Sequence, residues 1–289
     1  MGCFRMSRTV YLNGEWLAEE EAKISVFDRG FTFADAIYEV TAVLGGKLIE
    51  YSGHVARLKR SLGALQIKID LSDDEMLAVH REIVTRNNLE NGLIYLQISR
   101  GSEDRDFTFS RELKPTIVLY TQEKDILAQP KWKSGLKLVS HPEGRWANRQ
   151  IKTVQLLYSS LAKMTAVESG ADDVVFVEDG FITEASGSNF HIVTKEGVVV
   201  TRDLSNSLLH GITRGSLLEI ARKGGFKVEE RSFTLEEAYE AEEAFITAAT
   251  AFVSPVVELD GRPIGTGKPG PMVEKLRNLY IADRLAHAI

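Results

Sequence analysis

A glutamate at the end of a short predicted hairpin is the side chain best placed for chemistry in this sequence. Residues 175–183 form two apolar runs separated by Asp179-Gly180, a pair that favours a tight turn between strands. The second run leads to Glu184, and small hydroxyl and glycine residues follow it. This pattern predicts a carboxylate at the mouth of a site, with room beside the backbone for a flat ligand.

A lysine upstream of this hairpin could form a covalent bond to a carbonyl compound. Lys152 lies between a predicted strand and a predicted helix. A lysine that forms a Schiff base must lose its proton near neutral pH, which requires desolvation or a neighbouring cation. Arg149 could supply the cation, and Ile151 and Val154 could supply the apolar surroundings. On this short segment alone, an ordinary surface lysine is the better interpretation.

Two later segments could bind a phosphate group. Residues 207–216 begin a helix near Gly211, and the free N–H groups of a first helical turn attract an anion. A threonine that simply caps the helix would explain this pattern equally well. Residues 247–255 combine small side chains with the hydroxyl group of Thr250, so the backbone there could approach a phosphate closely.

The composition narrows the classes of function. The 289 residues carry a formal charge of −6 without a basic stripe, so we expect no nucleic-acid partner. No apolar run is long enough to cross a membrane, and the first residues lack the apolar core of a signal peptide. The single cysteine, Cys3, cannot form an internal disulfide. We therefore expect a cytoplasmic protein without a membrane partner and without a metal site.

Local patterns predict two domains. Residues 1–121 contain the hairpin signal Asn13-Gly14 and a capping box of Ser72 and Glu75, which together predict strands and helices in one small α+β domain. Residues 122–132 are polar and contain a proline, which is typical of a linker. Residues 133–289 alternate predicted strands and helices, which indicates a larger α/β domain.

The segment from Asp28-Arg29-Gly30 to Tyr38-Glu39-Val40 is the most specific signal of a family. Together with Lys152, the turn before Glu184 and the two phosphate-type segments, it resembles the fold-type IV pyridoxal-phosphate (PLP) enzymes. That family includes D-amino-acid aminotransferases, branched-chain aminotransferases and aminodeoxychorismate lyases. The resemblance extends from Val10 to about Arg277 and implies a two-domain fold, PLP as cofactor, and a homodimer.

The resemblance also implies a role for each candidate residue. Lys152 would carry the cofactor's aldehyde as a Schiff base, and Glu184 would meet the pyridine nitrogen, whose positive charge makes PLP an electron sink. Leu209 would lie against the ring. The implied phosphate ligands are Arg57, Ile212, Thr213, Ala249 and Thr250, with Ala249 acting through its backbone because related enzymes often have a hydroxyl group there.

Four residues are candidates for binding the substrate. Tyr38 matches the tyrosine that binds the substrate carboxylate in D-amino-acid aminotransferases, and Arg105 matches the arginine of a loop that reaches in from the partner subunit. Phe107 replaces the histidine of that loop, which removes one hydrogen-bond donor. The segment at Tyr95 also differs from the one usual in branched-chain aminotransferases.

The resemblance thus implies transamination between a D-amino acid such as D-alanine and a 2-oxo acid, either 2-oxoglutarate or pyruvate. Phe107 favours an alternative, an (R)-selective amine transaminase, while Arg105 disfavours it. A branched-chain L-amino-acid aminotransferase and an aminodeoxychorismate lyase are further alternatives. A binding module that kept the fold without PLP would require Lys152 or Glu184 to have lost its role.

Overall fold

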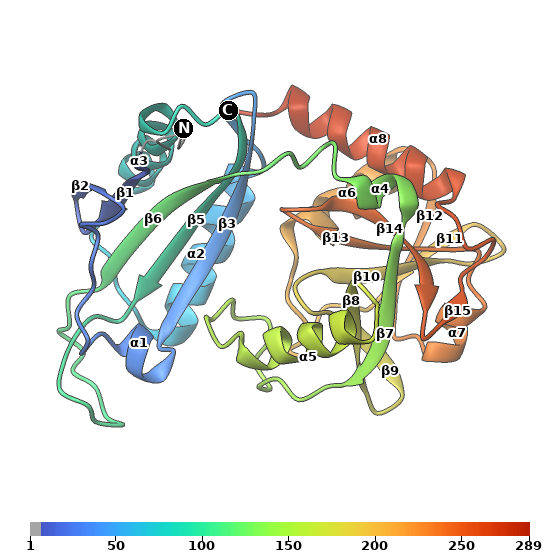
Figure 1. The fold of residues 1–289 in the computed structure, drawn as a ribbon, viewed down its shortest axis with the longest axis horizontal. Helices are drawn as coiled ribbons and strands as arrows, with labels where there is room; N and C mark the ends of the chain where they lie inside the picture. The colour runs from blue at the N-terminus through green and yellow to red at the C-terminus, as the bar shows by residue number, and fades with distance from the viewer. Residues whose placement is uncertain (1–6) are drawn as a thin grey trace, which may run out of the picture. The chain divides into compact units, whose positions relative to one another are not determined.

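The computed structural model describes residues 7–289, which divide into two compact units, each built around its own β-sheet (Figure 1). The first unit contains residues up to 125 together with residues 151–155 and the last two residues of the chain. The second unit contains residues 126–150 and 156–287. This mixed α/β arrangement with two sheets confirms the expected fold class. Cys3 lies outside the described residues.

The first unit is an antiparallel sheet with helices packed on it. Its strands lie in the order β2-β1-β6-β5-β3-β4. The elements are β1 (Thr9–Leu12), β2 (Glu15–Ala18), α1 (Arg29–Phe33), β3 (Ala36–Leu44), β4 (Lys47–Leu48), α2 (Tyr51–Leu65), α3 (Asp73–Arg86), β5 (Asn91–Ser99) and β6 (Thr116–Glu123).

Local sequence signals account for several of these elements. Asn13 and Gly14 both have positive φ angles, 52° and 99°, and they join β1 to β2 as predicted. Ser72 accepts a hydrogen bond from the backbone of Glu75, whose side chain bonds back to Ser72, so the predicted capping box is confirmed at the start of α3.

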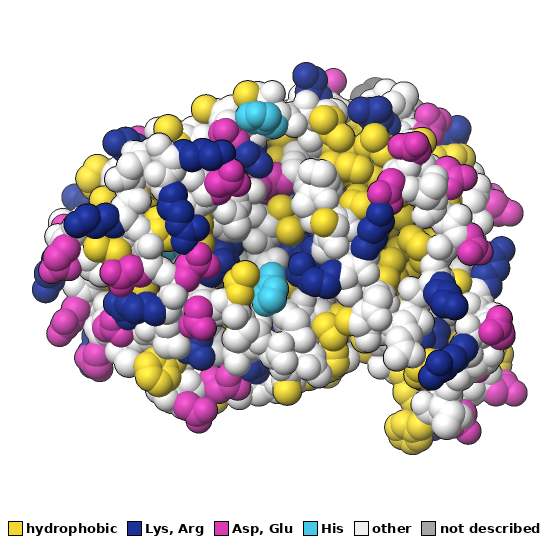
Figure 2. All heavy atoms as spheres, turned by 180° about the vertical axis from the view of Figure 1, so that it is seen from behind, with side chains coloured by type: hydrophobic (Ala, Val, Ile, Leu, Met, Phe, Trp, Pro, Cys, Tyr) yellow, Lys and Arg dark blue, Asp and Glu magenta, His cyan; other side chains and the backbone are white. Residues whose placement is uncertain are grey.

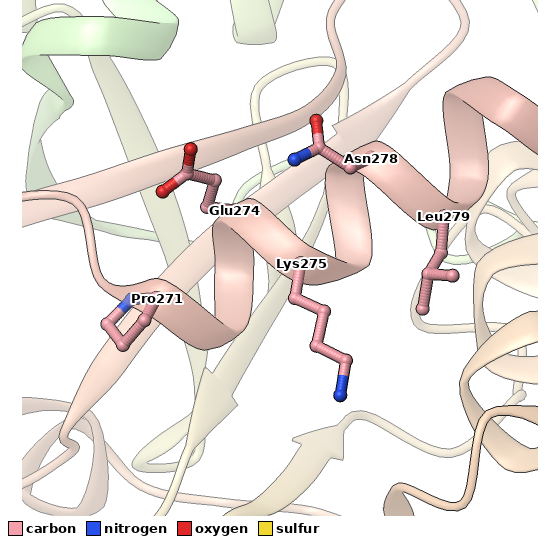
Figure 3. Close-up of a pocket in the computed structure, with 5 residues that line it drawn as sticks. All are labelled: Pro271, Glu274, Lys275, Asn278 and Leu279. Atoms are coloured by element: carbon pink, nitrogen blue, oxygen red, sulfur yellow. The ribbon is translucent and has the colours of Figure 1, made fainter.

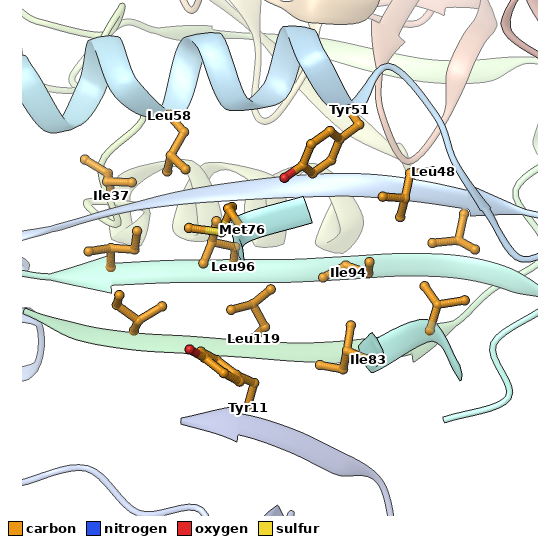
Figure 4. Close-up of a cluster of buried hydrophobic side chains, with 14 of the residues drawn as sticks. Tyr11, Ile37, Leu48, Tyr51, Leu58, Met76, Ile83, Ile94, Leu96 and Leu119 are labelled. Atoms are coloured by element: carbon orange, nitrogen blue, oxygen red, sulfur yellow. The ribbon is translucent and has the colours of Figure 1, made fainter. Parts of the chain in front are cut away.

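The core of the first unit lies between its sheet and its helices. Figure 4 shows Leu58 of α2 and Met76 and Ile83 of α3 facing apolar side chains of the strands, among them Ile94 and Leu119. All five side chains are at most 2% exposed. Burial of such side chains supplies the main stabilising free energy of the unit and fixes which residues of β3 and β5 face outward.

The second unit is built on a mixed sheet. Its main strand order is β12-β11-β10-β13-β14-β7-β8-β9, and β15 pairs with β14; the β11/β12, β14/β7 and β7/β8 pairs are parallel. The elements are α4 (Pro130–Ser134), β7 (Leu136–Pro142), α5 (Leu157–Glu168), β8 (Asp173–Glu178), β9 (Phe181–Ala185), β10 (Asn189–Val193), β11 (Val198–Thr201), α6 (Ile212–Lys223), β12 (Lys227–Glu230), α7 (Leu235–Tyr239), β13 (Glu243–Ala248), β14 (Phe252–Leu259), β15 (Arg262–Pro263) and α8 (Pro271–Ala286).

The division of the chain into two units differs from the expected domain boundaries in two ways. The expected linker, residues 122–132, is partly structured, because β6 continues to Glu123 and α4 begins at Pro130. Residues 151–155, which were expected in the larger domain, belong to the first unit. The reason is backbone pairing: Thr153 forms a bridge with Ile37 of β3, and the N–H of Tyr38 donates to the carbonyl of Lys152 at 3.0 Å.

Acidic and basic side chains are interspersed over the face of the protein that Figure 2 shows. Between residues 7 and 289, no helix combines the length and the apolar character needed to cross a lipid bilayer.

Candidate functional site

The predicted site residues divide between the two units. Glu184, Leu209, Ile212, Thr213, Ala249 and Thr250 belong to the second unit, and Tyr38, Arg57, Tyr95, Arg105, Phe107 and Lys152 belong to the first. Each set has its own internal geometry.

Glu184 is a buried carboxylate at the end of β9 with three donors around it. Its side chain is 3% exposed, and Arg145 Nη1 donates to it at 2.7 Å. Asn189 Nδ2 donates at 3.1 Å, and the backbone N–H of Leu209 donates at 3.1 and 3.2 Å to the two carboxylate oxygens. The turn before β9 has the predicted form, since Asp179 and Gly180 have φ angles of 52° and 83°.

The charge of Glu184 depends on a buried network centred on Arg145. Burial raises the pKa of Glu184, and the charge and hydrogen bond of Arg145 oppose that rise. Arg145 also binds both carboxylate oxygens of Glu143 at 2.7 and 2.9 Å. Burial of Glu143 raises its pKa too, but Arg145 outweighs this and the net shift is downward. The network therefore holds two carboxylates around one shared guanidinium.

Arg149, which could supply a cation for Lys152, is held by groups of the second unit. Its guanidinium donates to both oxygens of Glu178 at 2.8 Å and to the backbone carbonyl of Ser207 at 2.8 Å. Its charge is therefore committed to an ion pair in the second unit, whereas Lys152 belongs to the first unit.

The start of α6 is suited to an anion. The helix begins at Ile212, its N-cap Gly211 provides no side-chain hydrogen bond, and Thr213 is buried in its first turn. A Cβ atom on Gly211 would lie 2.0 Å from Asn189 Oδ1, so only glycine allows this close approach to β10. The dipole of this 12-residue helix places partial positive charge at its start, which favours binding of a negative group.

The turn from β13 to β14 offers a second set of donors. Within the described chain, the backbone N–H groups of Ala249 and Thr250 have no hydrogen-bond partner. Both residues are half-buried. Helix α6 packs against β13, the strand that leads into this turn.

These features of the second unit fit PLP. A flat, phosphorylated pyridine needs an acid for its ring nitrogen and N–H donors for its phosphate, and both are present. Leu209 connects the acid to the anion site along the chain. Its backbone N–H binds Glu184, and it lies three residues before Ile212, where α6 begins; its side chain is half-buried.

In the first unit, Lys152 and Tyr38 lie side by side. The Nζ atom of Lys152 is 4.0 Å from the centre of the Tyr38 ring, and both residues are half-buried. Tyr38 stacks on Tyr95 with ring centres 5.6 Å apart. The phenol group of Tyr95 donates to Gln97 at 2.8 Å, so this aromatic pair is held in place on the face of the sheet.

Arg57 forms a buried ion pair rather than projecting into solvent. Its Nε and Nη2 atoms donate to the two carboxylate oxygens of Glu39 at 2.7 and 2.8 Å, and His54 lies 2.8 Å from the same carboxylate. All three side chains are at most 4% exposed. Burial alone would raise the pKa of Glu39, but Arg57 and His54 outweigh it and lower the pKa to about 2.

Arg105 and Phe107 lie on an exposed loop. Phe107 is 81% exposed, and the guanidinium of Arg105 lies over the rings of Phe107 and Phe33. The base of the loop is anchored by buried Arg29, which donates to the carbonyls of Asp106 and Thr108 and to Glu103. No hydrogen bond or ring contact within the described chain joins Arg105 or Phe107 to Tyr38.

Sequence reasoning missed four residues that organise these groups: Arg145, Asn189, Glu39 and Arg29. A buried acid implies a cation or donors nearby, so Glu184 did imply partners such as Arg145. However, Arg145 lies 39 residues away in the sequence, and nothing local distinguishes it from Arg149.

Comparison with known proteins gives a consistent result. The profile of a family described as amino-transferase class IV matches residues 36–259. A D-alanine aminotransferase of Staphylococcus aureus is 35% identical, over 97% of this chain and 99% of that protein, and one of Bacillus licheniformis is 32% identical over 93% and 94%. The branched-chain aminotransferase of Thermoproteus uzoniensis superposes with a TM-score of 0.85, is 26% identical, and covers 97% of this chain and 95% of that chain. That of Escherichia coli has a TM-score of 0.91 at 22% identity, covering 96% and 95%, and supports the fold alone.

Proposed function

We propose that this chain, which belongs to the class IV aminotransferases, transfers an amino group between a D-amino acid such as D-alanine and a 2-oxo acid. The family uses PLP, which supplies an electron sink and carries the amino group between the two substrates. Relatives named D-alanine aminotransferases that match nearly the whole chain support the choice of D-amino acids. The 2-oxo acids that we propose as acceptors are 2-oxoglutarate and pyruvate.

The observation that carries the proposal is the pairing of Lys152 with Tyr38. Lys152 Nζ lies 4.0 Å from the Tyr38 ring, so the amine expected at the reacting carbon is beside the phenol expected at the substrate carboxylate. With Lys152 released from the aldehyde, its Nζ would take the α-proton of the donor and later return it, as a general base and then a general acid.

We assign the cofactor contacts as follows. Glu184 would hold the pyridine nitrogen, and Leu209 would lie against the ring. The N–H groups of Ile212, Thr213, Ala249 and Thr250 would bind the phosphate, as the start of a helix and a free turn allow. Arg57 is proposed as a further phosphate ligand from the first unit, with Glu39 fixing its guanidinium.

We further propose that the active form is a homodimer in the cytoplasm. Arg105 and Phe107 are exposed in the described chain, so their loop is available to a partner subunit. A two-fold axis would make this contribution reciprocal. The single cysteine of the sequence fits a reducing compartment. A monomer with full activity at assay concentrations would contradict the dimer.

One observation favours a second candidate, an (R)-selective amine transaminase. Phe107 presents an apolar ring, 81% exposed, where a D-amino-acid aminotransferase would have a histidine donor. An apolar ring suits a substrate group without a carboxylate, whereas Arg105 suits a carboxylate.

One substrate comparison tests these alternatives. The PLP-loaded protein is assayed with D-alanine, L-leucine and (R)-1-phenylethylamine as donors, each with 2-oxoglutarate and with pyruvate. We expect the largest kcat/KM for D-alanine. Preference for L-leucine would replace the proposal with a branched-chain aminotransferase, and preference for the amine would favour the second candidate. Release of pyruvate from aminodeoxychorismate without a 2-oxo acid would indicate a lyase.

A further inference from the structure

Arg277, on the C-terminal helix α8, is a buried cation whose hydrogen bonds all go to backbone carbonyl groups. Its side chain is 3% exposed. Nη1 donates to the carbonyl of Val253 at 2.7 Å and to that of Ala251 at 3.3 Å, and Nη2 donates to that of Leu127 at 3.1 Å. Burial lowers the pKa of Arg277, and no carboxylate of the described chain pairs with it to offset that effect. Arginine nevertheless stays charged, so its positive charge is not neutralised locally.

Two of these carbonyls belong to the region where the chain turns from β13 into β14. There Thr250 O accepts a hydrogen bond from Gln129 Nε2 at 3.1 Å, and Ala251 O accepts a second one from Ser254 Oγ at 2.9 Å. The carbonyls of Thr250, Ala251 and Val253 are thus all bound by side chains. At the tip of the turn, the N–H groups of residues 249 and 250 have no hydrogen-bond partner within the described chain.

Helix α8 is fixed in register with the strand that leads into this turn. Glu243, the first residue of β13, accepts hydrogen bonds from the N–H groups of Met272 and Val273 at 2.9 and 2.7 Å. A Cβ atom on Gly270 would lie 2.0 Å from the Glu243 carboxyl group, so glycine permits this close approach. Arg277 follows Val273 by one helical turn and therefore lies on the same face of the helix.

The two faces of α8 differ in character. Figure 3 shows Glu274, Lys275 and Asn278 on the part of α8 that borders an open surface hollow. In contrast, Val273, Leu276, Arg277 and Tyr280 are buried at 3% exposure or less. An arginine among these apolar side chains loses solvation, which requires compensating hydrogen bonds. The 249–252 turn supplies one of the three that it makes, at Ala251, and β14 supplies another just after the turn, at Val253.

We propose that Arg277 is a positioning residue that holds the 249–252 turn in the shape that binds the cofactor's phosphate. The inference rests on the proposed function, in which Ala249 and Thr250 contact that phosphate. Arg277 acts in two ways. Its Nη1 group binds the carbonyl of Ala251 in the turn and that of Val253 just after it, which holds the backbone so that the N–H groups at the tip remain unpaired. Its positive charge also attracts a dianion at the turn through a medium of low dielectric constant.

The test compares the binding of PLP with that of pyridoxal, which has the same ring and aldehyde but no phosphate. Dissociation constants are measured without substrate for the wild-type protein and the Arg277→Met and Arg277→Lys variants. In Arg277→Met we expect PLP to bind at least about tenfold more weakly, equivalent to about 1.4 kcal/mol, with no change for pyridoxal. Arg277→Lys keeps the positive charge but not the planar guanidinium group. If this variant binds PLP as tightly as the wild-type protein, the effect is due to charge alone and the positioning role is wrong.

Two further variants keep the test decisive if Arg277→Met folds poorly. Gln129→Met removes one neutral donor from Thr250 O and should weaken PLP binding less, again without an effect on pyridoxal. Lys275→Met is the matched control, because Lys275 is an exposed cation of the same helix that lies over the ring of Phe226, and it should change neither constant.

The inference would be overturned if Arg277→Met and Gln129→Met weakened the binding of PLP and of pyridoxal equally, or weakened neither. It would also be overturned if the wild-type protein bound PLP no more tightly than pyridoxal. Failure of D-alanine as a substrate while the PLP effect is present would reject the proposed function and leave the role of Arg277 intact.

Discussion

Arg145 donates to Glu184 across 2.7 Å in the second unit, and the two side chains form an ion pair that is almost completely buried. The pair is chemically necessary because burial by itself raises the pKa of Glu184, and a neutral acid could not stabilise a protonated pyridine nitrogen. Asn189 and the backbone of Leu209 add donors that also favour the ionised form. Hydrogen bonds from these neighbours, and not solvent, thus favour the ionised form of Glu184 against the effect of burial.

The first prediction is that Arg145→Met destabilises the protein in a pH-dependent way. The variant leaves Glu143 and Glu184 buried without their shared cation, and removal of one partner of a buried ion pair typically costs about 3–5 kcal/mol. The pKa of Glu184 is already raised above 4.5, so the folded state holds its proton to higher pH than the unfolded state does. The contribution of Glu184 to stability must therefore fall as pH rises above 4.5, and it should fall more steeply in the variant. Melting temperatures from pH 5 to 8 test this, and a deficit that is constant with pH would contradict it.

The second prediction concerns Glu184 directly. Glu184→Gln keeps the shape of the side chain and can still bind Leu209 N–H, so we expect the variant to retain most of its PLP. Turnover should fall at least about tenfold, because the electron sink loses its anionic partner. A primary isotope effect with α-deuterated D-alanine should increase if proton abstraction becomes slower. Wild-type turnover in this variant would show that the ring nitrogen is stabilised by another group.

The third prediction is an acid transition that depends on Glu39. The pKa of Glu39 in the folded protein is about 2, below the ordinary 4.5, so its contribution to stability is complete above pH 4.5 and is lost as pH falls towards 2. A shift of this size corresponds to roughly 3 kcal/mol. His80, whose pKa burial lowers to about 4, acts in a separate window between pH 6.5 and 4.

Glu39→Gln should remove the contribution of Glu39 to the acid-dependent loss below pH 4.5, so the variant should lose less free energy than wild type there. Free energies of unfolding in urea at pH 7, 4.5 and 3 measure this. The idea is wrong if wild type and variant lose the same free energy between pH 4.5 and 3.

The fourth prediction is that Lys152→Ala abolishes covalent attachment of PLP. Borohydride reduction followed by mass measurement should show the added mass on the wild-type protein and on Lys163→Ala, an exposed lysine of α5, but not on Lys152→Ala. Turnover should fall by at least about two orders of magnitude, the usual contribution of a positioned acid–base group. Retention of steady-state activity in Lys152→Ala would remove this lysine from the mechanism.

The parts of this protein that could be predicted from sequence are those that local interactions determine. The Asn13-Gly14 hairpin and the capping box of Ser72 and Glu75 depend on groups within a few residues of one another, and both have the expected form. Arg145 and Arg149 show the limit. Both are basic residues just upstream of Lys152, yet one meets Glu184 and the other meets Glu178, and only the folded sheet decides between them.

The same limit explains two further differences. Lys152 belongs to the first unit because its backbone pairs with β3, although the residues on both sides of its short segment belong to the second unit. Arg277 looks like any arginine of an amphipathic helix, and its role appears only when its guanidinium is seen on the carbonyls of Ala251 and Val253. Contacts of this kind join residues far apart in sequence, and no periodic pattern encodes them.

The last prediction separates the two candidate substrates through the exposed loop. Arg105 is the cation proposed to meet the substrate carboxylate, and loss of a charged hydrogen bond costs about 1.5–3 kcal/mol. Arg105→Ala should therefore raise KM for D-alanine roughly tenfold or more and change kcat/KM for (R)-1-phenylethylamine much less, because only D-alanine has a carboxylate. Phe107→His, which adds a donor at a side chain that is 81% exposed and so does not disturb a core, should raise kcat/KM for D-alanine and lower it for the amine. L-Alanine is the stereochemical control and should remain a poor substrate in every variant. Equal effects of Arg105→Ala on D-alanine and on the amine would mean that this loop does not read the carboxylate, and the specificity would then have to reside in the half-buried pair of Tyr38 and Tyr95.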